Sequence, residues 1–211
     1  MTKPECRLPS TIYPVVDDAR WIARLGGAGA RFIQLRVKDL PEADLERQVA
    51  EAASLALAHG VELVLNDYWQ LAIQDGRARP GIPWVHLGQE DLDTADRDAI
   101  LRAGLKLGVS THDNAELTRA LALEPDYVAL GPIWPTKLKQ MPCGPQGLER
   151  LREWRTLCGD VPLVAIGGIT CERAPSCIAA GADSVAAVSD FIGNDDPEQQ
   201  VRRWLVATTA S

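Results

Sequence analysis

The sequence predicts an α/β protein that folds as a single (β/α)8 barrel, the TIM barrel, over residues 1–211. Short aliphatic and β-branched runs alternate eight times with stretches of helical length rich in Ala, Leu, Glu and Arg. The chain is long enough for one substantial core and short for two. An open dinucleotide-binding sheet would place G-x-G-x-x-G after its first strand, where this chain reads Pro14-Val15-Val16-Asp17. A closed parallel barrel therefore fits better.

The eight expected strands are apolar runs, many of them bounded by glycine or proline. In order they read TIYPVV (11–16), FIQL (32–35), VELVL (61–65), WVHL (84–87), KLGV (106–109), YVAL (127–130), LVAI (163–166) and SVAAV (184–188). The helices that follow them are expected over 18–28, 42–59, 68–75, 93–103, 113–123, 145–157, 171–180 and 196–207. The glycine-rich segment 26–30 is interpreted as a helix C-cap and turn.

The composition argues against several classes of protein. Lys and Arg number 22 against 29 Asp and Glu, and the formal net charge of −7 opposes binding to nucleic acid or an anionic membrane. No apolar run reaches the ~18 residues needed to cross a bilayer, and the N-terminal residues lack the apolar core of a signal peptide. We therefore expect a cytoplasmic protein. Five cysteines without a C-x-x-C pair and three scattered histidines favour reduced thiols over a disulfide framework or zinc site.

Polar side chains follow the second expected strand, at the C-terminal end where this barrel carries its active site. Alternation along the chain places Gln34, Arg36 and Lys38 on one face. Burying an amide and two cations without partners is costly, so a bound anion would explain the pattern. A salt-bridged rim with Asp39 and Glu42 would explain it equally well.

Carboxylates follow the next two strands. Asn66 and Asp67 end the third strand, and Asp91 follows the fourth. Neighbouring parallel strands lie about 4.8 Å apart, so both carboxylates could reach one ion. Two carboxylates, with phosphate oxygens and water, are typical ligands of magnesium. Helix N-capping by either aspartate is the alternative at this point.

The fifth and sixth strands add a hydroxyl and a long loop to the same face. Ser110 follows the fifth strand and lies at the rim. The loop over 131–147 is the longest on this face, and it carries Lys137 and Lys139. Such a loop is a candidate lid, although exposed loop lysines are commonly just solvated.

The last two strands carry the pattern of a phosphate site. Gly167 and Gly168 follow the seventh strand, and Ser189 follows the eighth. In this fold, glycines and backbone N–H groups at these positions commonly bind phosphate, while a plain turn is the alternative for the two glycines. The face is thus expected to bind two anions, one at a cationic site and one at an amide-rich site. Two phosphorylated substrates fit this division.

In this order and combination, the segments resemble those of thiamine phosphate synthases. The matching segments are Q-L-R-x-K (34–38), N-D (66–67), H-L-G-Q-E-D (86–91), G-V-S-T-H (108–112), G-P-I-x-P-T-x-x-K (131–139), A-I-G-G-I (165–169) and V-S (188–189). The resemblance runs from about Tyr13 to Ser189 and is far more specific as a whole than in any one segment. It implies a transferase that couples hydroxymethylpyrimidine diphosphate to thiazole phosphate and releases pyrophosphate, with Mg²⁺ as cofactor.

The resemblance also implies a role for each matching residue. The pyrimidine diphosphate would be bound by Gln34, Arg36, Lys38, Asn66, Ser110 and Lys139, of which Arg36, Lys38, Ser110 and Lys139 would be catalytic. Magnesium would be held by Asp67 and Asp91. The thiazole phosphate would be bound by Thr136, Gly167, Gly168, Val188 and Ser189. The implied partners are two small molecules, without nucleic acid or membrane, and a homo-oligomer is compatible with the sequence.

Two departures and two alternatives accompany this resemblance. Leu138 replaces a threonine of the family pattern, so the thiazole contacts of its loop are expected to differ, and the extra residues 77–83 are expected to be silent on the opposite face. A thiazole tautomerase is the nearest alternative. It would need no metal and diphosphate site, and a histidine after Gly131 would favour it, where Pro132 stands. A non-catalytic barrel that binds thiamine precursors and regulates a partner is the second alternative.

Overall fold

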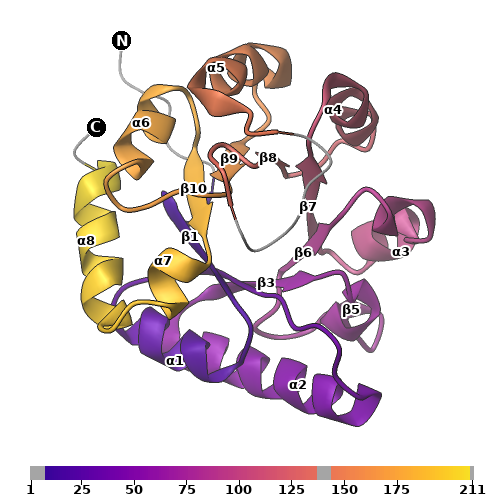
Figure 1. The fold of residues 1–211 in the computed structure, drawn as a ribbon. Coiled ribbons are helices and arrows are strands. Elements are labelled where there is room, and N and C mark those ends of the chain that lie inside the picture. Colours follow the sequence, from indigo (N-terminus) through magenta and orange to yellow (C-terminus); the bar gives the residue numbers. More distant parts are fainter. Residues whose placement is uncertain (1–7, 137–143, 210–211) are drawn as a thin grey trace.

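The computed structural model describes residues 8–136 and 144–209, which form a closed barrel of eight parallel strands inside a layer of helices (Figure 1). The barrel strands are β1 (Ile12–Val16), β2 (Phe32–Leu35), β3 (Glu62–Asn66), β6 (Trp84–Leu87), β7 (Lys106–Thr111), β8 (Tyr127–Leu130), β9 (Leu163–Ile166) and β10 (Ser184–Ala187). They pair in this order, and β10 returns to β1 with Val185 opposite Ile12. The predicted fold class is confirmed.

The outer layer consists of amphipathic helices that cover the strands. These are α1 (Arg20–Gly27), α2 (Glu42–His59), α3 (Arg97–Arg102), α4 (Asn114–Leu121), α5 (Gly147–Cys158), α6 (Ala174–Ala179), α7 (Ser189–Ile192) and α8 (Pro197–Thr209). In α2, Leu45, Val49 and Ala56 recur at helical spacing and are buried. The helix ends at Gly60, whose φ of 62° is the left-handed conformation of a typical C-cap. No helix in the described part of the chain combines the length and apolar content that a membrane crossing requires.

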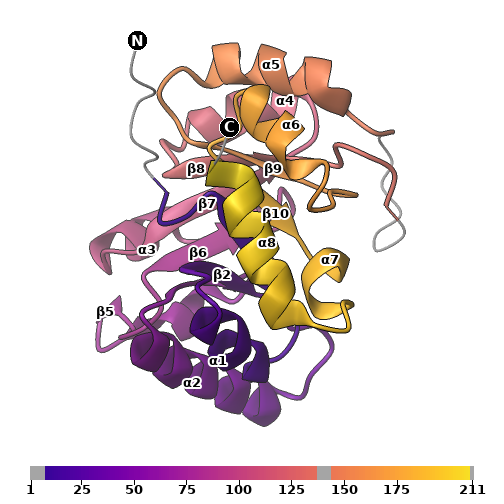
Figure 2. The same cartoon turned by 90° about the vertical axis from the view of Figure 1, so that its left-hand side faces the viewer.

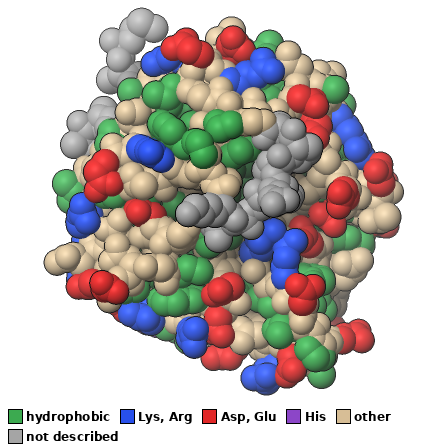
Figure 3. Space-filling model, in the orientation of Figure 1, with side chains coloured by type: hydrophobic (Ala, Val, Ile, Leu, Met, Phe, Trp, Pro, Cys, Tyr) green, Lys and Arg blue, Asp and Glu red, His purple; other side chains and the backbone are tan. Residues whose placement is uncertain are grey.

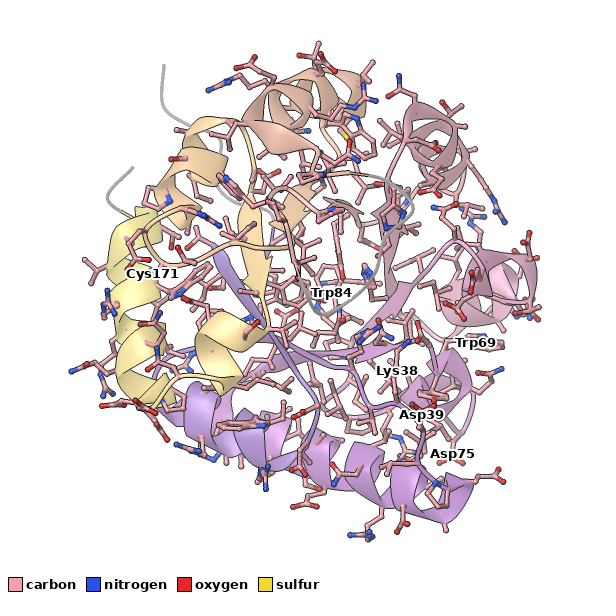
Figure 4. The ribbon with its side chains drawn as sticks, viewed as in Figure 1. Lys38, Asp39, Trp69, Asp75, Trp84 and Cys171 are labelled. Atoms are coloured by element: carbon pink, nitrogen blue, oxygen red, sulfur yellow. The ribbon has the colours of Figure 1, made fainter. Side chains whose placement is uncertain are left out.

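Two apolar layers hold the barrel together. One lies between strands and helices and includes Trp154 and Trp204. The other fills the barrel interior with aromatic rings from Tyr13, Phe32 and Trp84, among others. The rings of Tyr13 and Phe32 are stacked with centroids 4.2 Å apart, and Trp84 projects near the centre of the ring of strands in Figure 4. Because the interior is packed, ligands have access only at the ends of the barrel.

The helix predicted over 68–75 is wrong. The chain forms a short 3-10 helix, η1 (Trp69–Ala72), and then a hairpin of β4 (Ile73–Gln74) and β5 (Arg77–Ala78). Asp75 and Gly76 form its turn with φ of 52° and 74°. A two-residue hairpin turn requires positive φ at both positions, which Asp-Gly favours. This pair is therefore the sequence pattern that indicates the hairpin.

The extra segment 77–83 lies at the end of the barrel away from the expected site. The backbone N–H of Ala78 donates to the carbonyl of Ala103, which follows α3, at 2.7 Å, and Pro83 O accepts from Lys106 N, which begins β7, at 2.9 Å. Figure 2 shows β5 and α7 at opposite ends of the barrel. The expected position of this segment is therefore what the structure shows.

Other differences from the predicted elements concern the ends of two strands and the short helices that follow β6 and β10. The fifth barrel strand continues to Thr111 and so includes Ser110, while the eighth ends at Ala187. The helix predicted over 93–103 is divided into a 3-10 helix, η2 (Asp91–Asp93), and α3, whose N-cap Asp96 accepts from the backbone N–H of Ala99. The short helix α7 was not predicted.

Candidate active site

The mouth of the barrel, where the strands end, faces the viewer in Figures 1 and 3, and basic and acidic side chains are interspersed over this face. Asp67 follows β3 directly, with a φ of 66° and its N–H donating to the carbonyl of His86 at 2.9 Å. Asp91 begins η2 after β6. The two carboxyl groups are near enough for Asp91 to raise the pKa of Asp67. The structure thus brings together two carboxylates that come from different strands.

The environment of this pair favours a bound cation. Burial and, to a smaller extent, the charge of Asp91 and hydrogen bonding with it raise the pKa of Asp67 to about 6. Lys38 and Arg36 lower this pKa, so both cations are near enough to act on the carboxyl group. All four predicted side chains therefore lie in one region. In Figure 4, Trp84 lies near the centre of the barrel, and Lys38 lies away from the centre on the same side as Trp69.

The structure does not support helix capping as the reason for these aspartates. The N-cap positions of η1 and η2 are Tyr68 and Glu90, and neither makes a side-chain capping bond. Asp91 Oδ2 accepts from the backbone N–H of Gly88 at 3.1 Å. Within the described residues, the ion pairs found do not join Arg36 or Lys38 to a rim carboxylate; these cations act on Asp67 instead.

The donor set can be tested against magnesium. Oxygen ligands from two carboxylates suit this hard cation, provided that a bound phosphate and water complete its coordination. Among the described residues, no group of three or more His, Cys, Asp or Glu side chains is gathered for a metal. A cation at Asp67 and Asp91 would therefore depend on the ligand for its remaining partners. The residues present fit a metal that binds together with a diphosphate.

A row of buried polar groups leads from β2 across the barrel interior to β7. Gln34 Nε2 donates to the Tyr13 hydroxyl at 2.8 Å, and the hydroxyls of Tyr13 and Tyr127 are 2.8 Å apart. His86 lies 2.7 Å from the Tyr127 hydroxyl through Nδ1 and 2.7 Å from Ser110 Oγ through Nε2. Two of the predicted residues, Gln34 and Ser110, are therefore linked through three others.

Tyr13, His86 and Tyr127 were missed by the sequence analysis. Burial lowers the pKa of His86 to about 4, with Arg36 acting in the same direction, so the ring is neutral near pH 7. Burial raises the pKa of both tyrosines, which stay protonated. The alternation that placed Gln34 and Arg36 also places these residues inside the barrel, so the signal was present in each strand.

A cavity of about 270 Å³ lies on the other side of the mouth, between the ends of β8, β9 and β10. All five residues expected to bind thiazole phosphate line it, namely Thr136, Gly167, Gly168, Val188 and Ser189. Pro135, Ile166, Ile169 and Ala187 complete the wall. Since none of these lining residues is charged, an anion there would depend largely on backbone N–H groups and on the hydroxyls of Thr136 and Ser189.

The two glycines shape this cavity. Gly167 and Gly168 have φ of 95° and 65°, which other residues rarely adopt. A Cβ on Gly168 would lie 2.5 Å from the carbonyl oxygen of Pro135. The carbonyl of Gly167 accepts from the N–H of Trp134 at 3.0 Å, which ties the loop after β9 to the loop after β8. A plain turn elsewhere would not require such close approach.

Asp190 is a further residue that was not predicted. It follows Ser189, which lines the cavity. Its Oδ2 accepts from Trp204 Nε1 at 2.6 Å, from Gln200 Nε2 at 2.6 Å and from Cys171 N at 3.1 Å. These bonds connect α7, which begins at Ser189, to α8 and to the loop after β9. Figure 2 shows α7 and α8 side by side.

The structure describes only part of the long loop predicted over 131–147. Lys139, expected to be catalytic, and Leu138, the departure from the family pattern, fall in 137–143, outside the described residues. Thr136 is the last described residue before this gap, and it lines the cavity. Asn66 is buried at the end of β3, next to Asp67.

Known proteins resemble this chain in sequence and in fold. The sequence model of one family, described as thiamine monophosphate synthase, matches residues 12–191. The thiamine-phosphate synthase of Rhizobium etli is 54% identical over 93% of this chain and 94% of its own length. That of Escherichia coli strain K12 is 49% identical over 97% and 92%. A solved thiamine phosphate pyrophosphorylase from Pyrococcus furiosus has a TM-score of 0.83 at 23% identity and covers 98% of both chains, which shows the same fold.

Proposed function

Since this chain belongs to the thiamine monophosphate synthase family and is a transferase of thiamine biosynthesis, we propose that it couples hydroxymethylpyrimidine diphosphate to thiazole phosphate. The products are thiamine phosphate and pyrophosphate. One observation carries the proposal. A pair of aspartates within the influence of two cations and a cavity lined by paired glycines lie at the same mouth of the barrel. Two phosphorylated molecules bound there would have their reacting ends between the two regions.

The pyrimidine diphosphate belongs on the side of β2, β3, β6 and β7. Gln34 and Asn66, both buried at strand ends, offer amide groups to the heterocycle. Arg36, Lys38 and Ser110, with Lys139 from the long loop, would bind the diphosphate oxygens. Charge-assisted hydrogen bonds of this kind are stronger than neutral ones.

Magnesium would be held by Asp67 and Asp91, and when bound it supplies positive charge to the diphosphate leaving group. Ionised aspartates are the form that binds a cation. Arg36 and Lys38 already lower the pKa of Asp67 and so favour that form.

Thiazole phosphate belongs in the cavity between β8, β9 and β10. Its phosphate would accept hydrogen bonds from backbone N–H groups at Gly168 and Ser189 and from the hydroxyl of Thr136. Glycine at 167 and 168 lets the backbone come close to the ligand. This arrangement leaves the thiazole ring facing the pyrimidine side.

The chemical step would be a displacement at the CH2 group of the pyrimidine. The bond from this carbon to the diphosphate oxygen breaks, and its electron pair leaves with pyrophosphate. The lone pair of the thiazole nitrogen forms the new bond to carbon. This nitrogen carries no proton, so the reaction needs no general base. The protein therefore has to hold two molecules in line and stabilise negative charge on the leaving group. Arg36 and Lys38, whose charges act on Asp67, would supply that stabilisation.

The alternatives predict different behaviour. A thiazole tautomerase would need a proton-transferring group after Gly131, and Pro132 at that position is buried. A regulatory barrel would bind the precursors without releasing pyrophosphate. A cytoplasmic location is part of our proposal, supported by the biosynthetic relatives, and fractionation of the producing cells would test it.

Purified protein incubated with both substrates and Mg²⁺ tests the proposed function. We expect thiamine phosphate and pyrophosphate to appear in equal amounts, and chelation of Mg²⁺ to stop both. Binding of both substrates without pyrophosphate would instead identify a regulatory barrel. Isomerisation of the thiazole without coupling would identify a tautomerase.

A further inference from the structure

The five-residue chain of hydrogen bonds across the barrel has a direction, and we infer that it turns the hydroxyl proton of Ser110 toward the bound diphosphate. The inference rests on the proposed function for its ligand. The chain runs from Gln34 through Tyr13, Tyr127 and His86 to Ser110, with every donor–acceptor distance between 2.7 and 2.8 Å. Tyr13, Tyr127 and His86 are thus positioning residues, which act on the ligand through Ser110.

The first bond determines all the others. Gln34 Nε2 only donates, so the Tyr13 oxygen accepts from it. Among the bonds of the described residues, the buried Tyr13 proton has one acceptor, the Tyr127 oxygen, so Tyr13 donates to Tyr127. The Tyr127 proton is then given to Nδ1 of His86. A neutral His86 has one N–H, which must therefore be on Nε2, and it donates to Ser110 Oγ.

This direction decides what Ser110 offers to a ligand. Its oxygen accepts from His86, so its own proton is available to an acceptor outside the chain. With every bond reversed, Ser110 would donate to His86 and present only lone pairs to the mouth of the barrel. Lone pairs repel a diphosphate oxygen, whereas an O–H group binds it. The orientation of the Gln34 amide on β2 therefore controls the chemistry of a hydroxyl on β7.

The surroundings of the chain keep its direction intact. Tyr13 and Tyr127 are 1% and 0% exposed, and His86 and Gln34 are 6% and 4% exposed, so bulk water hardly competes for these bonds. Gly108 stands between His86 and Tyr127 in the strand register. A Cβ on Gly108 would overlap the ring of Tyr127. The missing side chain lets the phenol reach across β7 to His86.

The proton position on His86 is the most direct test. The protein has three histidines, so ¹⁵N–¹H correlation spectra of the imidazoles are simple. The signal that is lost in His86→Gln belongs to His86. We expect Nε2 to carry the proton and Nδ1 to be unprotonated in the ligand-free protein. A proton on Nδ1 would overturn the inference. This measurement uses no substrate, so it stands or fails separately from the proposed activity.

A double-mutant cycle tests the link to the ligand. We expect Tyr127→Phe to lower kcat/KM for the pyrimidine diphosphate about tenfold and Ser110→Ala about a hundredfold. The double variant should be no slower than Ser110→Ala alone, because both changes remove the same donated proton. Losses that multiply would show that Tyr127 does not act through Ser110.

Thr111→Val is the matched control. Thr111 follows Ser110 in β7, is fully buried, and donates to the carbonyl of Ala129 at 2.8 Å on the outer side of the strand. Its loss removes one buried hydroxyl from the same strand without touching the chain. We expect the His86 signal and kcat/KM to stay as in the wild type. If Thr111→Val changes both as much as Tyr127→Phe does, the effect comes from general loosening of β7, and the inference fails.

Discussion

Asp91 raises the pKa of the Asp67 carboxyl group although the two residues follow different strands. The register of β3 and β6 explains this, because Asn66 pairs with His86 and the N–H of Asp67 continues the ladder to the His86 carbonyl at 2.9 Å. The left-handed conformation of Asp67 turns the chain away, and the 3-10 turn of η2 brings Asp91 back. The charge of Asp91 disfavours the ionised form of Asp67, which a bound cation would reverse.

Asp91→Asn should slow turnover by roughly 10²–10³ without unfolding the barrel, because it removes one preorganised charge from the metal pair. Steady-state kinetics over a range of Mg²⁺ concentrations would measure this loss. Asp93→Asn is the matched control, since Asp93 lies in the same 3-10 helix, is exposed, and pairs with Arg119 at 2.6 Å. Near-normal activity in Asp91→Asn would remove Asp91 from the metal site.

The raised pKa of Asp67 predicts a pH-dependent stability. The folded protein holds this proton up to pH of about 6, against 3.8 ordinarily, so the stabilising contribution is present at low pH and is lost as the pH rises through 6. Asp67→Asn removes this titration and suits the left-handed backbone, which Asn tolerates.

We therefore expect that, in EDTA, the Tm of Asp67→Asn rises relative to that of the wild type as the pH increases from 4 to 7. Because the Asp67 side chain is partly exposed, the corresponding gain in the free energy of unfolding should be about 1 kcal/mol or less. His86 titrates with the opposite sign, but it is present in both proteins and cancels in the difference. A Tm difference that stays constant with pH would show that Asp67 has an ordinary pKa.

Gly168→Ala should raise the KM for thiazole phosphate and destabilise the fold by about 1–3 kcal/mol. The new Cβ would lie 2.5 Å from Pro135 O at a φ of 65°, so the cavity wall must move. Urea unfolding and kinetics with each substrate in turn would measure the two effects. Gly27→Ala is the control, since its Cβ meets nothing within 4 Å at the end of α1. A KM effect limited to the pyrimidine substrate would contradict the assignment of this cavity.

Lys139→Ala should cost roughly 10²–10³ in kcat, because the proposed contact of this cation with the leaving group is lost. Lys137→Ala in the same loop should have little effect, as expected of a solvated lysine. Single-turnover measurements with saturating substrates would separate the chemical step from binding. Equal losses in the two variants would mean that the loop contributes net charge and no specific contact.

The sequence predicted the barrel well because each strand carries its own signal. The run WVHL at 84–87, for example, is apolar and bounded by Pro83 and Gly88, and it forms β6 at those residues. The segment after β3 was predicted as a helix over 68–75, although it contains the Asp-Gly pair of a hairpin turn. The Asp75-Gly76 turn overrides this local preference.

The candidate site was predictable in part. Residues with charges or glycines after the strands, such as Asp67 and Gly168, could be found because the fold collects strand ends at one mouth. For Tyr13 and Tyr127 the alternation predicts an interior position but no role, since a tyrosine in a strand is ordinarily core. Only the closed barrel brings their hydroxyls together. Asp190 depends on three partners from two other segments of the chain, a coincidence that no local pattern contains.

Closure of the ring by β1 and β10 has a consequence for how the molecule is made. Ile12 finds its partner Val185 only after nearly the whole barrel has been synthesised. Until then β1 has hydrogen-bonding partners on one side only, and the emerging chain exposes an open edge. Contacts between such distant residues make folding slow and raise the need for protection from aggregation during translation. A ribosome-stalled fragment that ends before β10 should therefore be bound by chaperones more strongly than one that includes it.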